Sequence, residues 1–106
     1  MKLRSTSKYR NRPTMLNGIR FHSAKEARRY GELLLLEKVE EVTELRRQVR
    51  WPLEVNGIKV CTYASDFEYI IGGKRVTEDV KGVRTPLYKL KKALMYAIHG
   101  VKIKET

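Results

Sequence analysis

Residues 65–82, SDFEYIIGGKRVTEDVKG, decide the fold because they read as two β-strands joined by the glycines at positions 72 and 73. A Gly-Gly pair between runs of β-branched and aromatic residues is a hairpin signal. A two-residue loop pairs Ile71 with Lys74, and counting outward from that pair sets Asp66 opposite Asp79. The stretch therefore predicts a hairpin in which two carboxylates face each other across the ladder.

Side chains of a strand alternate between its two faces, so Lys81 shares a face with Asp79, while Glu78 and Val80 point the other way. Opposed like charges destabilise a sheet by roughly 0.2–1 kcal/mol, and a divalent cation would remove that repulsion. The alternative is an incidental pairing, because 33% of the residues are charged and a three-residue loop would shift the register. Short motifs give false positives, so the surrounding sequence has to decide.

Length and charge limit the class of protein. A chain of 106 residues allows one domain with a modest core. The net charge of +11 and the pI near 10.0 indicate a polyanionic partner, most simply nucleic acid. The longest apolar run, residues 33–36, is too short to span a membrane. No signal peptide is evident, and the lone Cys61 cannot build a disulfide framework. We expect a soluble, cytoplasmic protein with no membrane partner.

Every charged residue before Glu26 is basic. We predict that residues 1–15 form a flexible basic arm and that residues 16–106 form a single domain. Tyr9 among the cations favours contact with nucleic acid, since an aromatic ring can stack on an exposed base. A merely solubilising tail is the alternative.

Helix signals flank the hairpin on both sides. Ser23 to Glu26 read as a capping box, from which a helix runs to about Val39. Two roles stay open for Glu26, as the helix cap or as a carboxylate that approaches the aspartate face. A second helix begins at Thr85-Pro86 and ends at His99-Gly100.

Strand signals complete the predicted fold. Asn17-Gly18 predicts a turn, residues 43–55 have β character, and Asn56-Gly57 predicts a hairpin that returns through residues 58–71. With residues 74–81 these segments predict a three-stranded antiparallel meander, and residues 101–103 a last strand. The fold class is α/β, in the order helix-strand-strand-strand-helix-strand, with a central, mostly antiparallel mixed sheet flanked by helices.

Three blocks of the chain together resemble a known group of enzymes. Residues 21–30 (FHSAKEARRY), 62–67 (TYASDF) and 76–82 (VTEDVKG) resemble a small phage-borne family within the PD-(D/E)XK nuclease superfamily, related to Holliday-junction resolvases. The likeness covers nearly all of the chain after about Tyr9. It implies a minimal restriction-endonuclease-like core and a structure-specific DNA endonuclease that hydrolyses phosphodiester bonds with Mg²⁺ or Mn²⁺. For a phage-encoded protein, the compartment would be the host cytoplasm.

The resemblance also implies roles for individual residues. Asp66 and Asp79 would bind the metal, Glu26 would complete the metal shell, and Lys81 would orient or help deprotonate the attacking water. Val80 completes the predicted metal-ligating set.

Several features depart from the family pattern or extend it. Ser65 stands where the superfamily name has Pro, and Asp79 stands where Glu is commoner, which could change the metal distance. Glu68 lies on the same face as Asp66 and is a spare ligand candidate. Gln48 resembles a strand glutamine of some of these sites, but the register sets it opposite Ser65, so a bulge near Pro52 would be required to bring it to Asp66.

The predicted partner is DNA, branched or nicked. Because resolving a junction needs two cuts and the chain has one site, we expect a homodimer. The rival hypothesis is a non-catalytic, basic DNA- or RNA-binding protein whose acidic hairpin is incidental. The predicted nucleic-acid contacts are Lys8, Arg10, Arg12, Arg28, Arg29, Lys89 and Lys92.

Overall fold

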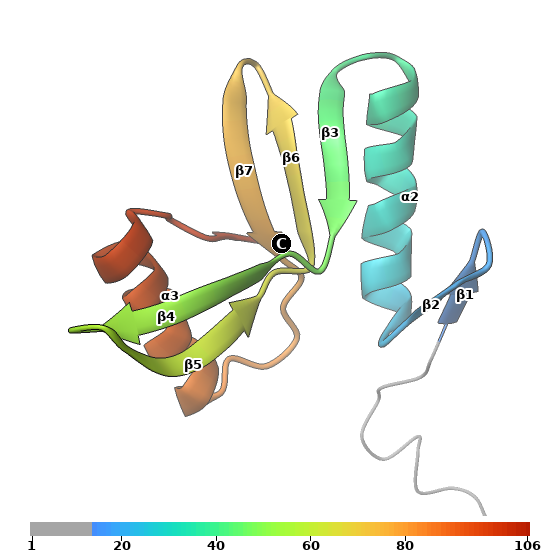
Figure 1. Ribbon diagram of the computed structural model, residues 1–106. Coiled ribbons are helices and arrows are strands. Elements are labelled where there is room, and N and C mark those ends of the chain that lie inside the picture. Colours follow the sequence, from blue (N-terminus) through green and yellow to red (C-terminus); the bar gives the residue numbers. More distant parts are fainter. Residues whose placement is uncertain (1–13) are drawn as a thin grey trace, which may run out of the picture.

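The computed structural model describes residues 14–106 and shows a mixed α/β protein with mostly antiparallel strands (Figure 1). The described part of the chain contains helices α2 (Ala24–Lys38) and α3 (Pro86–His99). Neither of these two helices is long and apolar enough to cross a membrane. The strands are β1 (Thr14–Leu16), β2 (Ile19–Phe21), β3 (Val42–Arg47), β4 (Arg50–Val55), β5 (Ile58–Ala64), β6 (Phe67–Ile71), β7 (Lys74–Asp79) and β8 (Lys104–Glu105).

The central sheet has the strand order β3-β6-β7-β8. Strands β6 and β7 form the hairpin predicted from the glycine pair, with Ile71 paired with Lys74, so the predicted register is confirmed. The ladder ends at the pair Phe67 and Glu78. Beyond it the Asp66 amide donates to the carbonyl of Glu78, at 3.1 Å, so the regular pairing stops just before the two aspartates. Because β8 runs parallel to β7, the sheet is mixed.

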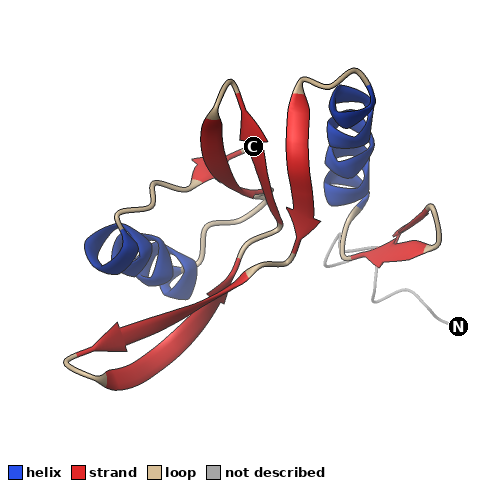
Figure 2. Ribbon diagram, turned by 45° about the horizontal axis from the view of Figure 1, so that its top comes forward, coloured by secondary structure: helices blue, strands red, loops and turns tan. Residues whose placement is uncertain are grey.

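Both long predicted strands divide at a common bend. Residues 43–55 form β3 and β4, residues 58–71 form β5 and β6, and β4 and β5 leave the sheet as a two-stranded ribbon (Figure 2). At the bend Gln48 has a φ of 52°, and its amide donates to the Asp66 carbonyl at 3.0 Å. The prediction of continuous strands in one meander is wrong, since the left-handed backbone at Gln48 turns β4 out of the sheet.

A bulge in the ribbon sets the alignment at this bend. The register shifts by one residue between Leu53 and Glu54, where Val60 on β5 is the extra residue. The shift moves Gln48 from the position opposite Ser65 to the position opposite Asp66. The bulge that the sequence required near Pro52 therefore exists.

Two hydrophobic cores lie on either side of the bend. Helix α2 covers the first, which is built on the central sheet and contains Phe21, Ala27, Leu33, Val42, Phe67 and Tyr69. Helix α3 covers the second, which is built on the ribbon and contains Leu53, Tyr63, Tyr88, Met95 and Ile103. The bend therefore lies between the core under α2 and the core under α3 (Figure 1).

The helix ends follow the predicted signals. The Ser23 hydroxyl accepts from the Glu26 amide at 3.1 Å, and the Thr85 hydroxyl accepts from the Tyr88 amide at 3.1 Å. Helix α3 ends at Gly100, whose φ of 69° is the left-handed conformation that glycine adopts without strain. Both predicted helices are confirmed.

The last strand lies later than predicted. The Val101 amide donates to the Met95 carbonyl at 3.2 Å, as part of the helix terminus, and Ile103 is buried in the second core. Residues 101–103 therefore serve the end of α3, and pairing with β7 begins only at Lys104.

The predicted arm ends earlier than residue 15. Thr14 and Met15 belong to β1, which pairs with β2 around the predicted turn at Asn17-Gly18. The rest of the predicted arm, residues 1–13, lies outside the described residues.

Candidate active site

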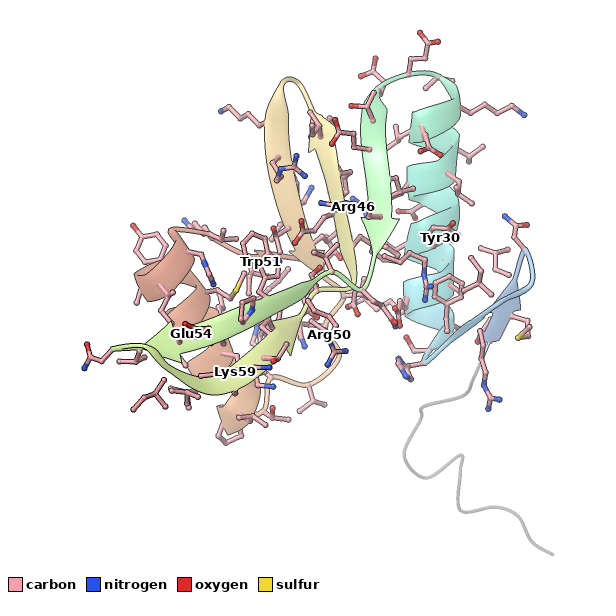
Figure 3. The ribbon with its side chains drawn as sticks, viewed as in Figure 1. Tyr30, Arg46, Arg50, Trp51, Glu54 and Lys59 are labelled. Carbon is pink, nitrogen blue, oxygen red and sulfur yellow. The ribbon has the colours of Figure 1, made fainter. Side chains whose placement is uncertain are left out.

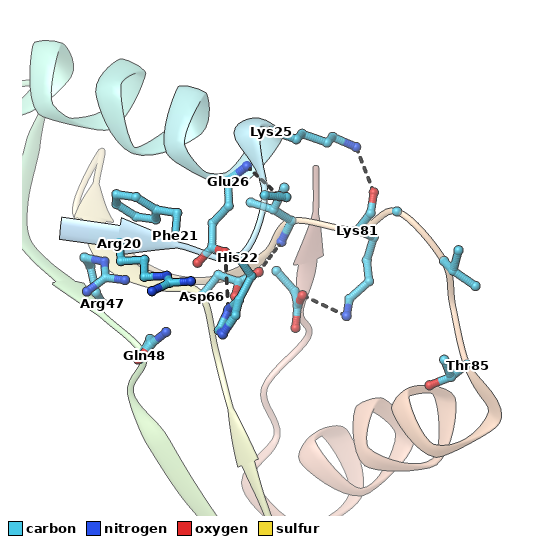
Figure 4. Close-up of a pocket in the computed structure, with 15 residues that line it drawn as sticks. Arg20, Phe21, His22, Lys25, Glu26, Arg47, Gln48, Asp66, Lys81 and Thr85 are labelled. Atoms are coloured by element: carbon cyan, nitrogen blue, oxygen red, sulfur yellow. Dashed lines mark hydrogen bonds and ion pairs between the residues drawn. The ribbon is translucent and has the colours of Figure 1, made fainter. Parts of the chain in front are cut away.

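A pocket of about 1230 Å³ lies at the bend, between the two cores. The side chains of Glu26, Asp66 and Asp79 line it, together with Lys81 and Gln48 (Figure 4). These residues come from α2, the β5–β6 junction, the end of β7 and the bend between β3 and β4. The structure thus brings all four predicted catalytic residues into one pocket.

Asp66 lies where β5 passes into β6. The Val80 amide donates to its Oδ2 at 2.7 Å, which fixes the carboxylate across the end of the hairpin. Burial, followed by the negative charges of Asp79 and Glu26, raises the pKa of Asp66 to about 7 against the opposing hydrogen bond from Val80. The pocket therefore disfavours a full set of ionised carboxylates unless a cation is present.

Asp79 ends β7 and is held by two neighbours. Lys81 Nζ lies 2.9 Å from its Oδ1, and the buried Tyr63 hydroxyl donates to its Oδ2 at 2.6 Å. Burial, followed by the hydrogen bond to Asp79, raises the pKa of Tyr63, so the hydroxyl stays a donor. Tyr63 was not identified from the sequence, because only the departure of the ribbon from the sheet brings β5 under Asp79.

Lys81 is positioned by contacts other than its salt bridge. Its Nζ lies 3.7 Å from the centre of the Tyr88 ring, in a cation–π contact. The Lys25 ammonium donates to the Lys81 carbonyl at 2.7 Å and ties the loop after β7 to α2. The lysine side chain is only 19% exposed, so it faces the pocket in a restricted position.

The carboxylate of Glu26 belongs to the pocket and does not complete a capping box. Its backbone amide is capped by Ser23, but no bond from its side chain returns to that residue among the described contacts. Its Oε1 lies 3.9 Å from His22 Nδ1, and its buried Oε2 has no hydrogen-bond partner among residues 14–106. A carboxylate oxygen without a partner, in a residue that is only 4% exposed, is available to a water or a cation in the pocket.

These donors fit a hard cation that keeps much of its own water. Within residues 14–106 no group of three or more His, Cys, Asp or Glu side chains is arranged to enclose a metal ion. Mg²⁺, however, is commonly bound through one or two carboxylates, with waters and substrate phosphate supplying the remaining oxygens. The Asp66 and Asp79 carboxylates, the free Glu26 Oε2 and the backbone oxygen of Val80 are oxygen donors of that kind.

Other acidic residues near the hairpin have partners elsewhere. Glu68 does not line the pocket, because its Oε2 accepts from Trp51 Nε1 at 2.5 Å and from Thr77 Oγ1 at 3.3 Å. Glu78 points away from the pocket, as strand parity predicted, and its carboxylate binds Arg29 at 2.7 and 3.0 Å. Gln48 does line the pocket, as the bulge allows.

The predicted nucleic-acid contacts fall into different groups. Arg28 and Lys89 are exposed, whereas Lys92 Nζ lies 2.9 Å from Glu105 Oε2. The guanidinium of Arg29 is bound by Glu78 and Glu32. These carboxylates occupy the N–H donors that would otherwise bind a phosphate. Lys8, Arg10 and Arg12 lie outside the described residues.

A family model described as "Protein of unknown function (DUF1064)" matches residues 6–105, and the chain therefore belongs to that family. No curated protein gives a significant match to the chain. No solved structure does so either.

Proposed function

We propose that this member of the DUF1064 family is a metal-dependent DNA endonuclease that hydrolyses phosphodiester bonds. The finer assignment, a minimal PD-(D/E)XK core acting on branched or nicked DNA, rests on the sequence resemblance. The single observation that carries the proposal is the convergence of Glu26, Asp66 and Asp79 in one pocket, with the buried Glu26 Oε2 unpartnered among residues 14–106.

Asp66 and Asp79 would hold the cation, Mg²⁺ or Mn²⁺, with the backbone oxygen of Val80 as a further donor. Glu26 would complete the shell through bound water, since no three acidic side chains within residues 14–106 are arranged to enclose an ion. When bound, such an ion stabilises charge on a phosphoryl oxygen and makes water a better nucleophile near neutral pH. The raised pKa of Asp66 supports this assignment, because burial and the charges of Asp79 and Glu26 disfavour the ionised carboxylate, and a bound cation would stabilise that ionised form.

Lys81 supplies a positive charge next to the carboxylates. Its ammonium lies 2.9 Å from Asp79 Oδ1, and in the proposed reaction it would stabilise the charge that develops on the phosphate and orient the attacking water. Tyr63 fixes the other oxygen of Asp79 at 2.6 Å, so the carboxylate is oriented from both sides before substrate arrives.

A polyanionic substrate fits the charge of the molecule. The net charge of +11 supplies sequence-independent attraction for DNA, and the exposed Arg28 and Lys89 are not ion-paired within residues 14–106. A non-catalytic nucleic-acid-binding protein would have the same charge, but it would not require the carboxylate pocket.

A cleavage assay tests the proposal. Purified protein is incubated with supercoiled plasmid, linear duplex and a four-way junction, in Mg²⁺, in Mn²⁺ and in EDTA. We expect cutting only with the metals, and loss of cutting in Asp66→Asn and in Asp79→Asn. DNA binding should persist or tighten in both variants, because each loses a negative charge facing phosphate.

Glu37→Gln provides the matched control, since Glu37 is an exposed carboxylate on α2 and does not line the pocket. This variant should cut as the wild type does. Full activity of Asp66→Asn and Asp79→Asn would refute the assignment of the site. Tight DNA binding without cutting under any of these conditions would favour the non-catalytic alternative.

A further inference from the structure

Arg47 has an unusual environment at the pocket. It ends β3, lines the pocket and is only partly exposed. Its buried Nε has no hydrogen-bond acceptor among residues 14–106, and its guanidinium has no ion pair with any carboxylate in that part of the chain. Buried polar groups nearly always have a partner, so the unsatisfied Nε of this pocket-lining cation calls for an acceptor from outside residues 14–106, such as a water or an anion.

Aromatic rings hold the Arg47 side chain in place. Its Cζ lies 4.6 Å from the centre of the Phe21 ring and 5.9 Å from that of the Tyr30 ring. Phe21 is buried and packs against Tyr30 with ring centres 5.2 Å apart. Stacking contacts of this kind orient the planar guanidinium without using its N–H donors.

Arg20 adds a second guanidinium to the same pocket. Figure 4 shows Arg20 and Arg47 gathered with Gln48 on one side, while Lys81 lies on the other side of the carboxylates. Like Arg47, Arg20 makes no ion pair within residues 14–106. A carboxylate lies 2.7–3.9 Å from each of Arg29, Arg46, Arg75 and Arg84. Arg28 and Arg50 also make no ion pair within residues 14–106, but neither lines the pocket, so Arg20 and Arg47 are distinguished by being unpaired at the pocket.

Two neighbouring cations without an acidic partner attract an anion that has several acceptor oxygens. A phosphodiester fits, since guanidinium groups bind phosphate oxygens through paired N–H donors. We propose that Arg47 and Arg20 form a phosphate subsite. The phosphodiester to be cut lies at Asp66 and Asp79, and the subsite binds another phosphodiester of the same DNA strand, which does not react. The identity of the ligand rests on the proposed nuclease function, whereas the anion site rests on Arg47 and Arg20.

Equilibrium binding without catalysis tests the subsite. The affinity for a fluorescein-labelled DNA duplex is measured by anisotropy in EDTA over a range of KCl concentrations. The variants are Arg47→Gln and, as the matched control, Arg46→Gln. Arg46, labelled in Figure 3, adjoins Arg47 on β3 and is exposed. Its guanidinium lies 3.9 Å from the Glu68 carboxylate. Both variants lose one positive charge, so a purely general charge effect would be the same in each.

Arg47→Gln should weaken binding at least about tenfold and should reduce the slope of log affinity against log salt by about 0.9, as expected for one lost phosphate contact in duplex DNA. Arg46→Gln should change the slope by less than half of that amount. Equal changes in the two variants, or an unchanged slope in Arg47→Gln, would overturn the proposal.

A second measurement follows DNA binding to the wild-type protein, and a conservative variant serves only to assign one resonance. The Nε–H resonance of Arg47 in a ¹H–¹⁵N spectrum is assigned by its absence in Arg47→Lys. Adding a short oligothymidylate in EDTA should shift this resonance and leave that of Arg46 in place. A stationary Arg47 resonance at saturating DNA would refute the subsite. Because neither measurement involves cutting, the subsite can stand even where the plasmid assay shows no nuclease activity.

Discussion

Neutralising Asp66 should stabilise the metal-free protein, and the effect should depend on pH. In the folded protein burial and the charges of Asp79 and Glu26 raise the pKa of Asp66 from 3.8 to about 7. A raised pKa in the folded state means that ionisation opposes folding. The stability that the protonated carboxyl contributes is therefore fully present below about pH 4 and is lost as the pH rises through about 7.

The size of the effect follows from the same values. The interval from 3.8 to about 7 corresponds to at most about 4 kcal/mol, at 1.36 kcal/mol for each pH unit. Asp66 keeps partial contact with solvent, and screening reduces the expected effect to about 1–2 kcal/mol. Asn has nearly the same shape, keeps an acceptor for the Val80 amide and cannot ionise.

The assay is urea unfolding in EDTA at pH 5 and at pH 8, with wild type, Asp66→Asn and the exposed-site control Glu37→Gln. Relative to Asp66→Asn, the wild type should lose about 1 kcal/mol of unfolding free energy between the two pH values, because the change from pH 5 to about 7 covers roughly two thirds of the interval over which the effect develops. Glu37→Gln should follow the wild type. Millimolar Mg²⁺ at pH 8 should raise the wild-type melting temperature and leave Asp66→Asn nearly unmoved. A pH-independent difference between wild type and Asp66→Asn would refute the charge repulsion, and an equal response to Mg²⁺ would refute the shared metal.

Three other changes probe the surroundings of the pocket. Tyr63→Phe removes the 2.6 Å hydrogen bond to Asp79, so it should lower the free energy of unfolding in urea by about 1–2 kcal/mol. It should also slow plasmid cleavage, and unchanged cleavage would exclude Tyr63 as a positioning residue. Glu78→Gln should destabilise the fold by about 3 kcal/mol, because it leaves the Arg29 guanidinium without its buried partner at 2.7 Å, and a loss below 1 kcal/mol in the same assay would contradict that account. Deleting residues 1–12 removes five cations, so DNA affinity should fall and its salt dependence should become shallower, while the cleavage rate at saturating DNA should persist; an unchanged salt slope would show that the N-terminal cations do not contact phosphate.

Local signals in the sequence determined much of the fold. The glycine pair at positions 72 and 73 fixes the register of β6 and β7, because a two-residue loop leaves only one pairing, and so it predicts that Asp66 and Asp79 lie opposite each other. Ser23 and Thr85 begin their helices for an equally local reason, since a hydroxyl at the N-cap accepts a nearby main-chain amide.

Other assignments depended on packing between distant segments. The sequence allowed Glu26 to cap its own helix or to face the aspartates, and only the placement of α2 beside the end of the hairpin turned its carboxylate into the pocket. Arg29 looked available for phosphate until the sheet set the buried Glu78 beside it. In both cases the local sequence permits two partners, and the partner with the lower desolvation cost is known only once the core is assembled.

The bend is where sequence and tertiary structure divide most clearly. Alternation along the chain predicts strands and their faces, but it does not show where a strand pair leaves the sheet. The left-handed backbone at Gln48 and the extra residue Val60 set the place where β4 and β5 leave the sheet. On either side of that place, each core has its own helix packed against it. The sequence therefore determined that Asp66 and Asp79 come together at the end of the hairpin. The tertiary structure decided that Tyr63, Gln48 and Arg47 join them, since these come from segments that meet only after the ribbon has turned away.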